Sequence, residues 1–173
     1  MISADLKRRV DFYSKSGMKD FFSVFLSAGF IAVLVYRFGQ ACRAWPVFFA
    51  WPFMILYLVL FYLVQTLMGI SIQAYARIGP GFVICERGCV FVVAESIGEN
   101  FTVSQGVTVG NIRGSKGLPE IGDNVYIEPG AKVLGHIKIG SNVVIRSNSL
   151  LLKDAPDNSL VCGNPARITP LNG

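Results

Sequence analysis

The sequence predicts a mainly β fold in which an apolar α-helical N-terminal region precedes a parallel β-helix. Two observations predict it: a stretch of 33 residues without charge between Arg43 and Arg77, and a six-residue repeat of branched apolar residues after residue 71. The 173-residue chain is 52% hydrophobic and 16% charged, against about 25% charged in an average soluble domain. This composition excludes a disordered chain. We divide the chain into a helical leader, residues 1–70, and a β-helix with a C-terminal tail, residues 71–173.

The leader contains a segment that is apolar enough to enter a membrane. Val47 to Val64 is 18 residues without charge, and about 18–20 such residues can cross a bilayer as a helix. The 16-residue segment from Phe21 to Tyr36 is shorter and suits a hairpin partner or an interfacial helix. Trp45 and Trp51 carry rings that favour the headgroup zone. We therefore expect residues 21–68 to contact a membrane surface or bilayer; the alternative is a helical layer buried between subunits.

The net charge of +5 is unevenly distributed along the chain. Residues 1–46 hold seven Lys or Arg and three Asp, whereas residues 77–173 hold nine basic and eight acidic residues. Basic charge beside apolar segments suits anionic lipid headgroups. The C-terminal half has no basic stripe with interleaved aromatic residues, so nucleic acid is not an expected partner. With one histidine, the chain cannot build the three-histidine zinc site known on β-helices, and we assign no metal.

A period of six dominates the second half of the chain. The repeat residues are Ile72, Ile78, Ile84, Val90, Ile97, Val103, Val109, Ile121, Ile127, Val133, Ile139, Ile145 and Leu151. Six is neither the period of a helix nor the alternation of an ordinary strand, and it is typical of a hexapeptide β-helix. The step from Val109 to Ile121 is twice the period, which indicates an inserted loop.

Three six-residue units close one triangular coil, so each repeat residue should stack on its counterpart in the next coil. We expect Val103 to stack over Ile121 across the insertion and Ile127 over Ile145. Branched aliphatic side chains fill such a ladder. The Asn residues of Glu99-Asn100 and Asp123-Asn124 suit corners with positive φ. The thirteen repeat positions give a little over four coils.

Several motifs in this half resemble the serine acetyltransferase family of hexapeptide-repeat acyltransferases. They are Ala76-Arg77-Ile78-Gly79-Pro80-Gly81, Gln105-Gly106-Val107-Thr108-Val109-Gly110, Ile121-Gly122-Asp123-Asn124-Val125-Tyr126-Ile127, Gly130-Ala131-Lys132-Val133-Leu134-Gly135 and Cys162-Gly163-Asn164-Pro165-Ala166-Arg167-Ile168. The resemblance covers roughly residues 70–170. The leader, with Tyr36-Arg37-Phe38-Gly39, looks more like that of membrane-associated relatives that acetylate polysaccharides than like the long helical domain of biosynthetic serine acetyltransferases.

The resemblance implies a left-handed parallel β-helix that assembles as a homotrimer and takes acetyl-CoA as acyl donor. The site in such proteins lies between neighbouring subunits, where a histidine acts as general base on the acceptor hydroxyl. This sequence departs from that pattern. The first histidine of the family falls on Glu86, its orienting acid on Ser71, and the second histidine on Gln105.

Three interpretations of this departure remain open. Glu86 could replace histidine as base, since burial in an apolar cleft raises the pKa of a carboxyl, with Gln105 as hydrogen-bond donor. The catalyst could instead be lost, leaving an oligomeric scaffold or regulatory subunit. Cys85 or Cys89 as nucleophile is the weakest interpretation, because little nearby would activate a thiolate. The single histidine, His136, is more simply a surface corner residue.

The resemblance also places the binding site of the acyl donor. It implies Gly110 and the inserted loop with Arg113, Gly114 and Lys116; Gly130 and Ala131 beside the pantetheine arm; and Lys153 and Arg167 at the nucleotide end. The expected function is O-acetylation of a hydroxyl, on a surface-polysaccharide sugar precursor or on L-serine. The expected location is the cytoplasmic face of a bacterial inner membrane, with the soluble cytoplasm as alternative.

Overall fold

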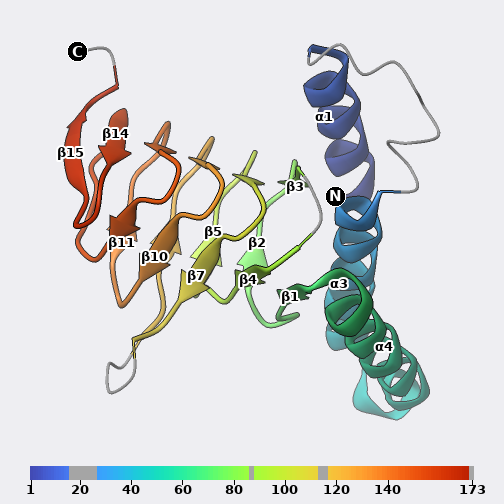
Figure 1. Cartoon of the computed structure of the whole chain (residues 1–173). Helices are drawn as coiled ribbons and strands as arrows, with labels where there is room; N and C mark the ends of the chain where they lie inside the picture. Colours follow the sequence, from blue (N-terminus) through green and yellow to red (C-terminus); the bar gives the residue numbers. More distant parts are fainter. Residues whose placement is uncertain (16–26, 86–87, 113–116, 172–173) are drawn as a thin grey trace.

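The computed structural model describes residues 1–15, 27–85, 88–112 and 117–171, and it shows helices followed by a β-solenoid (Figure 1). The described helices are α1 (Ile2–Lys15), α3 (Ala28–Ala44) and α4 (Val47–Met68). The first strand begins at Ile70, directly after Gly69, which ends α4 in the left-handed conformation.

The strands form three sheets that make the three faces of the solenoid. Sheet A contains β1 (Ile70–Ile72), β4 (Val90–Val92), β7 (Thr108–Gly110), β10 (Lys132–Leu134) and β13 (Leu150–Leu151). Sheet B contains β2 (Arg77–Ile78), β5 (Ser96–Ile97), β8 (Glu120–Ile121) and β11 (Lys138–Ile139). Sheet C contains β3 (Val83–Ile84), β6 (Thr102–Val103), β9 (Tyr126–Ile127), β12 (Val144–Ile145), β14 (Ser159–Cys162) and β15 (Arg167–Pro170). The strand pairs are parallel except for β14 and β15. The predicted fold class, a left-handed parallel β-helix after an apolar helical region, is confirmed.

The inward ladder follows the predicted repeat with two corrections to its register. All thirteen repeat residues are at most 4% exposed, and Ile127 pairs with Ile145 as expected. Val103 pairs with Ile127, however, and not with Ile121. Ile121 continues sheet B from Ile97, because the inserted loop lies between sheets A and B. Val92, not Val90, continues the ladder of sheet A from Ile72.

The corner between sheets B and C is held by a ladder of asparagines. The φ angles of Asn100, Asn124, Asn142 and Asn158 are positive, at 57°, 55°, 58° and 56° respectively. Each side-chain amide donates to the next in the ladder, at 3.0, 3.1 and 3.1 Å. The predicted positive φ of Asn100 and Asn124 is therefore confirmed, and the side chains add cross-coil hydrogen bonds.

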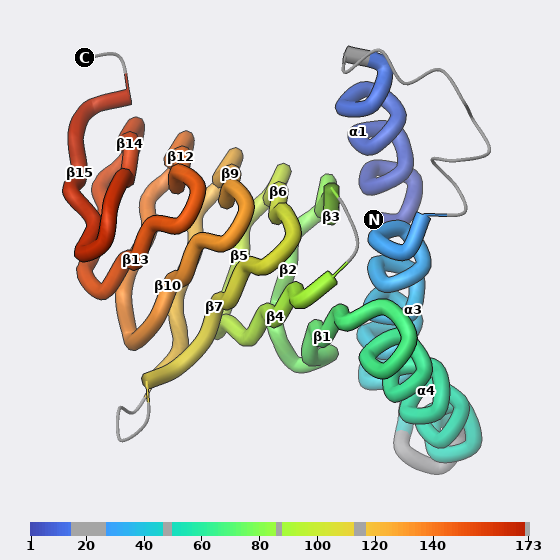
Figure 2. The backbone as a smooth tube through the Cα atoms, viewed as in Figure 1, coloured from blue at the N-terminus to red at the C-terminus, as the bar shows by residue number. Residues whose placement is uncertain are grey.

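Helix α3 covers the open end of the first coil, whose strands have no preceding coil to pair with (Figure 2). Arg37 donates to the carbonyl oxygens of Ile78 at 2.7 Å and Gly79 at 2.6 Å. The Tyr36 hydroxyl donates to Ala76 O at 2.7 Å and accepts from Ile78 N at 3.1 Å. Burial raises the pKa of Tyr36 to about 12, so the phenol keeps its proton.

Helix α1 covers the same edge on the side of sheet C. Asp5 accepts from the backbone N–H of Gly81 at 2.7 Å and of Phe82 at 2.8 Å, and it pairs with Arg37 at 2.8 Å. Both side chains of this ion pair are almost fully buried, at 1% and 3% exposure.

Two arginines of α1 also bind the solenoid. Arg8 donates to Phe101 O at 3.0 Å and Thr102 Oγ1 at 2.8 Å, and Arg9 to Ile84 O at 3.1 Å. The expectation that the basic charge of the leader faces lipid headgroups is therefore wrong for these two residues and for Arg37. Their charge is used to bind backbone carbonyls.

Helix α4 packs against α3 and leaves its other side uncovered. The two helices are joined by Trp45–Pro46, so α3 is the hairpin partner of α4. Within α4, Ala50–Met68 is long and apolar enough to cross a bilayer, and 11% of it is buried. Residues 21–26 of the shorter apolar segment lie outside the described residues, and its remainder is largely buried in α3.

Substitution of Asp5 by Ala tests the cap of the first coil. The change leaves Arg37 buried without its anion and removes the acceptor of two N–H groups, so we expect a loss of about 3–5 kcal/mol in the free energy of unfolding. Urea unfolding followed by circular dichroism measures it. As a control, Arg77→Ala removes the exposed ion pair of Arg77 with Glu95, which should cost about 0–1 kcal/mol. Equal losses in the two variants would contradict the assigned role of the cap.

Candidate functional site

The predicted catalytic positions lie where the chain passes from sheet C to sheet A. We call this edge the C–A corner (residues 85, 88–89, 104–107, 128–131 and 146–149). Backbone hydrogen bonds stack it coil on coil: Gly106 N donates to Gly88 O at 3.1 Å, and Gly130 N to Gln105 O at 2.9 Å. The structure thus brings Gln105 and Gly130 into adjacent coils of one column.

Glycine backbone and one lysine shape the C–A corner around Gln105. Gly106 and Gly130 have φ of +72° and +75°, a conformation that other residues rarely adopt. The Lys132 Nζ donates to Gly106 O at 2.5 Å, which holds the ammonium beside the Gln105 backbone. Gln105 is half-buried, so its amide is within reach of a ligand at this edge. Lys132 was not predicted as a site residue from the sequence; its position two residues after Gly130 was the available signal.

Glu86 lies outside the described residues, but the backbone before it is held by α1. The Tyr13 hydroxyl donates to Cys85 O, and Arg9 donates to Ile84 O. Cys89, on the other side, is exposed with φ of 53°. Helix α1 therefore anchors the end of β3 from which the candidate base follows.

The predicted donor residues divide between two corners. Gly110 ends β7 at the edge between sheets A and B, where Gly135 N donates to its carbonyl at 2.9 Å. Arg113, Gly114 and Lys116 lie outside the described residues. The loop returns at Gly117, where an added Cβ would lie 2.7 Å from Cγ of His136. His136 is an exposed corner residue that supports this return, as its simpler interpretation predicts.

The remaining donor residues lie farther along the solenoid. Lys153 is exposed after β13 at the A–B edge, and Arg167 is exposed in β15, opposite Cys162. The side chain of Ala131 is fully buried in the core, so only its backbone lines the C–A corner. One chain therefore brings Gln105 together with Gly130, and it does not bring either of them to Gly110 or Lys153.

Sheet A separates these two groups and presents an outer face with both apolar and polar side chains. Phe91 is 42% exposed, while Thr108, Lys132 and Leu134 are half-buried. Gly110 has no side chain, and an added Cβ would reach only the Phe91 ring, at 3.7 Å. Such a face can accept a flexible apolar arm or a neighbouring chain, with hydrogen-bond donors of Gln105 and Lys132 at one edge.

The chain is similar in sequence and in structure to known acyltransferases. Residues 119–153 match the family model described as bacterial transferase hexapeptide (six repeats). Over these residues the chain is similar to that family. A serine acetyltransferase of Staphylococcus aureus (strain Mu50) is 46% identical over 109 residues, which are 61% of this chain and 51% of that protein. The chain thus spans about half the length of that relative.

Solved structures of serine acetyltransferases are similar over nearly the whole chain. The Neisseria gonorrhoeae enzyme in complex with serine has a TM-score of 0.79 at 28% identity, covering 96% of this chain and 66% of that chain. The Brucella abortus strain S19 enzyme in complex with coenzyme A has a TM-score of 0.82 at 27% identity, covering 98% and 66%. This coverage extends to the helices, whose apolar sequence had suggested a different kind of leader.

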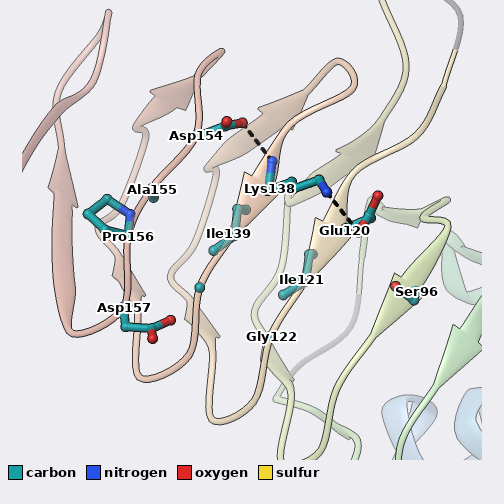
Figure 3. A pocket seen from close by; sticks show the side chains of 11 residues that line it. Ser96, Glu120, Ile121, Gly122, Lys138, Ile139, Asp154, Ala155, Pro156 and Asp157 are labelled. Atoms are coloured by element: carbon teal, nitrogen blue, oxygen red, sulfur yellow. Dashed lines mark hydrogen bonds and ion pairs between the residues drawn. The ribbon is translucent and has the colours of Figure 1, made fainter.

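A groove on sheet B was not predicted from the sequence (Figure 3). It has a volume of about 650 Å³ and is lined by the outer face of β8 and β11 and by residues 154–157. Lys138 Nζ lies 3.8 Å from Glu120, and its backbone N–H donates to Asp154 at 2.8 Å. These charges pair with one another, and no predicted site residue lines the groove. Among the described residues, no group of three His, Cys, Asp or Glu side chains could hold a metal ion.

Glu128 fixes the C–A corner one residue before Pro129 and two before Gly130. Its carboxylate accepts from Arg146 at 2.8 Å and from the backbone N–H and the hydroxyl of Ser147, each at 2.9 Å. Burial alone would raise the pKa of Glu128, but the hydrogen bonds from Arg146 and Ser147 outweigh it and place the pKa below its usual range. The ionised carboxylate therefore joins two successive coils.

Substitution of Glu128 by Gln tests this connection through its pH dependence. Because the pKa is lower in the folded state, the stabilisation is present above the unfolded pKa and is lost as pH falls through the folded pKa. We expect the variant to be less stable than wild type at neutral pH, and the difference to shrink below about pH 4. Urea unfolding at several pH values measures it. Glu120→Gln, at a longer and exposed pair, should show little pH-dependent difference, and a constant difference for Glu128→Gln would refute the assignment.

Proposed function

We propose that the protein transfers the acetyl group of acetyl-CoA to a hydroxyl group of a small acceptor. The observation that carries this proposal is the 46% identity over 109 residues to a serine acetyltransferase. Coenzyme A and serine are bound in the solved structures of similar proteins. L-Serine is accordingly the first acceptor to test.

In the proposed reaction the acceptor oxygen attacks the thioester carbonyl carbon, and the carbon–sulfur bond breaks. The acceptor proton passes to the base at position 86 and then to the thiolate of the released CoA. A positioned base contributes roughly 10²–10⁴-fold to such a step. Gln105 and Lys132 at the C–A corner supply hydrogen-bond donors for the oxygen that becomes negative.

We propose a homotrimer, because the site residues of one chain lie on different corners. Gln105 and Gly130 are at the C–A corner, and Gly110 and the inserted loop are at the opposite edge of sheet A. A neighbouring subunit that presents its A–B edge to this C–A corner would complete a single site for donor and acceptor.

A sugar hydroxyl on a surface-polysaccharide precursor is the second candidate acceptor. The exposed apolar side of α4 supports it, because such precursors are assembled at membranes. The corresponding location is the cytoplasmic face of a bacterial inner membrane, and the soluble cytoplasm would suit free serine.

A catalytically impaired scaffold or regulatory subunit is the alternative function. It is favoured by one observation: the chain has a single histidine, His136, which supports the inserted loop and lies away from Gln105. The two functions differ in whether wild-type protein releases CoA in the presence of an acceptor.

Substitution of Glu86 by Gln tests the enzyme proposal. The variant keeps the size of the side chain and loses the base, so we expect kcat to fall by about 10²–10⁴-fold with little change in CoA affinity. Thiol release from acetyl-CoA with L-serine measures kcat, and calorimetry measures CoA binding. Glu99→Gln is the matched control and should keep wild-type activity, because Glu99 is an exposed acid at the corner between sheets B and C.

The outcomes separate the hypotheses. Wild-type protein that binds no CoA would end the proposal altogether. Binding without transfer to serine or sugar acceptors would favour the scaffold. Full activity in Glu86→Gln would remove Glu86 from the mechanism and leave the reaction intact.

Substitution of Lys153 and Arg167 by Gln tests the nucleotide end of the donor site. Each exposed cation paired with a phosphate is worth about 0.2–1 kcal/mol, so we expect each change to raise the Kd for CoA by up to about fivefold. The effect should fall as salt is added, and kcat at saturating donor should not change. Arg77→Gln, on the outer side of sheet B, is the control. Unchanged affinity in both variants would place the phosphates elsewhere.

A further inference from the structure

Helix α4 is apolar on the side that faces α3 and equally apolar on the side that faces away. Its contact seam consists of Ala50, Met54, Tyr57, Phe61, Val64 and Met68, which are buried or half-buried. Its exposed apolar residues, which we call the outer surface, are Trp51, Phe53, Ile55, Leu56, Leu58, Val59, Tyr62, Leu63 and Leu67, each between 42% and 76% exposed. A helix that is hydrophobic all round is normally covered by protein or lipid.

The exposed charge that borders the outer surface, Arg43, is positive and therefore suits an anionic lipid surface. An apolar cavity of about 460 Å³ opens at the turn between α3 and α4, lined by Cys42, Trp45, Trp51 and Leu58 among others, with the exposed Arg43 at its rim. The start of α1 borders the same end of the hairpin, where Met1 and Ile2 are exposed. No acidic side chain lines these cavities or the one along Ile55–Leu67. A partner protein would normally meet a polar rim around an apolar centre.

The packing of the hairpin fixes its orientation relative to the solenoid. The ring of Tyr57, near the middle of α4, packs against Gly39, where a Cβ would collide with it. Tyr36 and Gln40, on either side of Gly39, both donate to Ala76 O, at 2.7 and 3.4 Å. The middle of α4 is therefore level with the first coil, and the hairpin lies across the end of the solenoid (Figure 1).

This geometry is incompatible with a spanning α4. The helix is about 33 Å long, so spanning would place Tyr57 near the centre of a hydrocarbon layer about 30 Å thick. The first coil and the Asp5–Arg37 pair would follow it into the lipid, and irregular backbone is not tolerated there. A helix lying along the interface buries only its outer surface, by about 5–10 Å.

We infer that α4 lies in the plane of a membrane, with its outer surface in an anionic bilayer, and that it does not cross. The inference deepens the proposed location of the protein and is independent of the proposed chemistry, because its test contains no acetyl-CoA. Failure of acetyl transfer and failure of membrane binding can therefore be distinguished.

Vesicle flotation of the full chain tests the occupant of the outer surface. We expect the protein to float with vesicles of phosphatidylcholine mixed with phosphatidylglycerol, and less with phosphatidylcholine alone. Leu58→Glu should lower the vesicle partition coefficient about tenfold or more, because loss of one buried leucine already corresponds to that factor. Leu152→Glu is the matched control, since Leu58 and Leu152 are both 46% exposed and Leu152 lies on the solenoid. Both variants should keep the wild-type circular dichroism spectrum.

The depth of residue 58 distinguishes lying from spanning. Trp45 and Trp51 are the two tryptophans of the chain, so the triple variant Trp45→Phe, Trp51→Phe, Leu58→Trp reports from one position. We expect lipids brominated near the headgroup to quench its fluorescence more than lipids brominated near the chain end. Stronger quenching by the deeper bromines would overturn the in-plane orientation. Absence of flotation, together with self-association that Leu58→Glu abolishes, would overturn the bilayer and assign the outer surface to a second copy of the chain.

Discussion

A β-helix has an unsatisfied edge at each end, and the architecture of this protein depends on how the first edge is closed. The strands of the first coil present carbonyl and N–H groups that no earlier coil can pair with. Two helices supply missing partners through side chains: Arg37 and Tyr36 from α3, and Asp5, Arg8 and Arg9 from α1, where Arg8 donates to Gly81 O. Buried arginines are tolerated here because the planar guanidinium of each one donates hydrogen bonds to several acceptors in a fixed geometry. The far edge of sheet C is closed differently, by the antiparallel return of β15.

The same contacts connect the helical region to the candidate chemistry. Tyr13 and Arg9 hold the end of β3, from which the C–A corner begins, and backbone hydrogen bonds carry that position to Gln105 and Gly130. Gln105 and Gly130, the described part of the site at this corner, therefore lie on a hydrogen-bonded column. In the proposed trimer, the contact between subunits would bring the donor side of the site, which lies across sheet A, to this corner.

The repeat explains why so much of the fold could be predicted. Each inward position is set by local sequence, and the period alone identifies thirteen buried residues, of which Val90 lies outside the ladder that Val92 continues. The register of the strands was harder to predict, because the inserted loop shifts every later position. Val103 pairs with Ile127, since the loop follows Val109. The adjacency of Gln105 and Gly130 could be anticipated from family motifs. The partners of Arg8, Arg9 and Arg37 could not, because contacts between residues 32 to 94 positions apart leave no periodic signal. The helical leader was expected to differ from serine acetyltransferases, yet their structures superpose on nearly all of the chain.

The solenoid also sets the distance between the helices and each layer of the C–A corner. Each coil raises the C–A corner by one strand spacing, about 4.8 Å. In the inferred in-plane orientation of α4, the first coil is nearest to the lipid, and the coils of Gln105 and Gly130 stand one and two steps higher. Gly69 joins α4 to β1 through a single left-handed residue, so no flexible linker changes these heights. In that orientation, the number of coils between helix and site determines how far above the bilayer a membrane-bound acceptor must extend its hydroxyl.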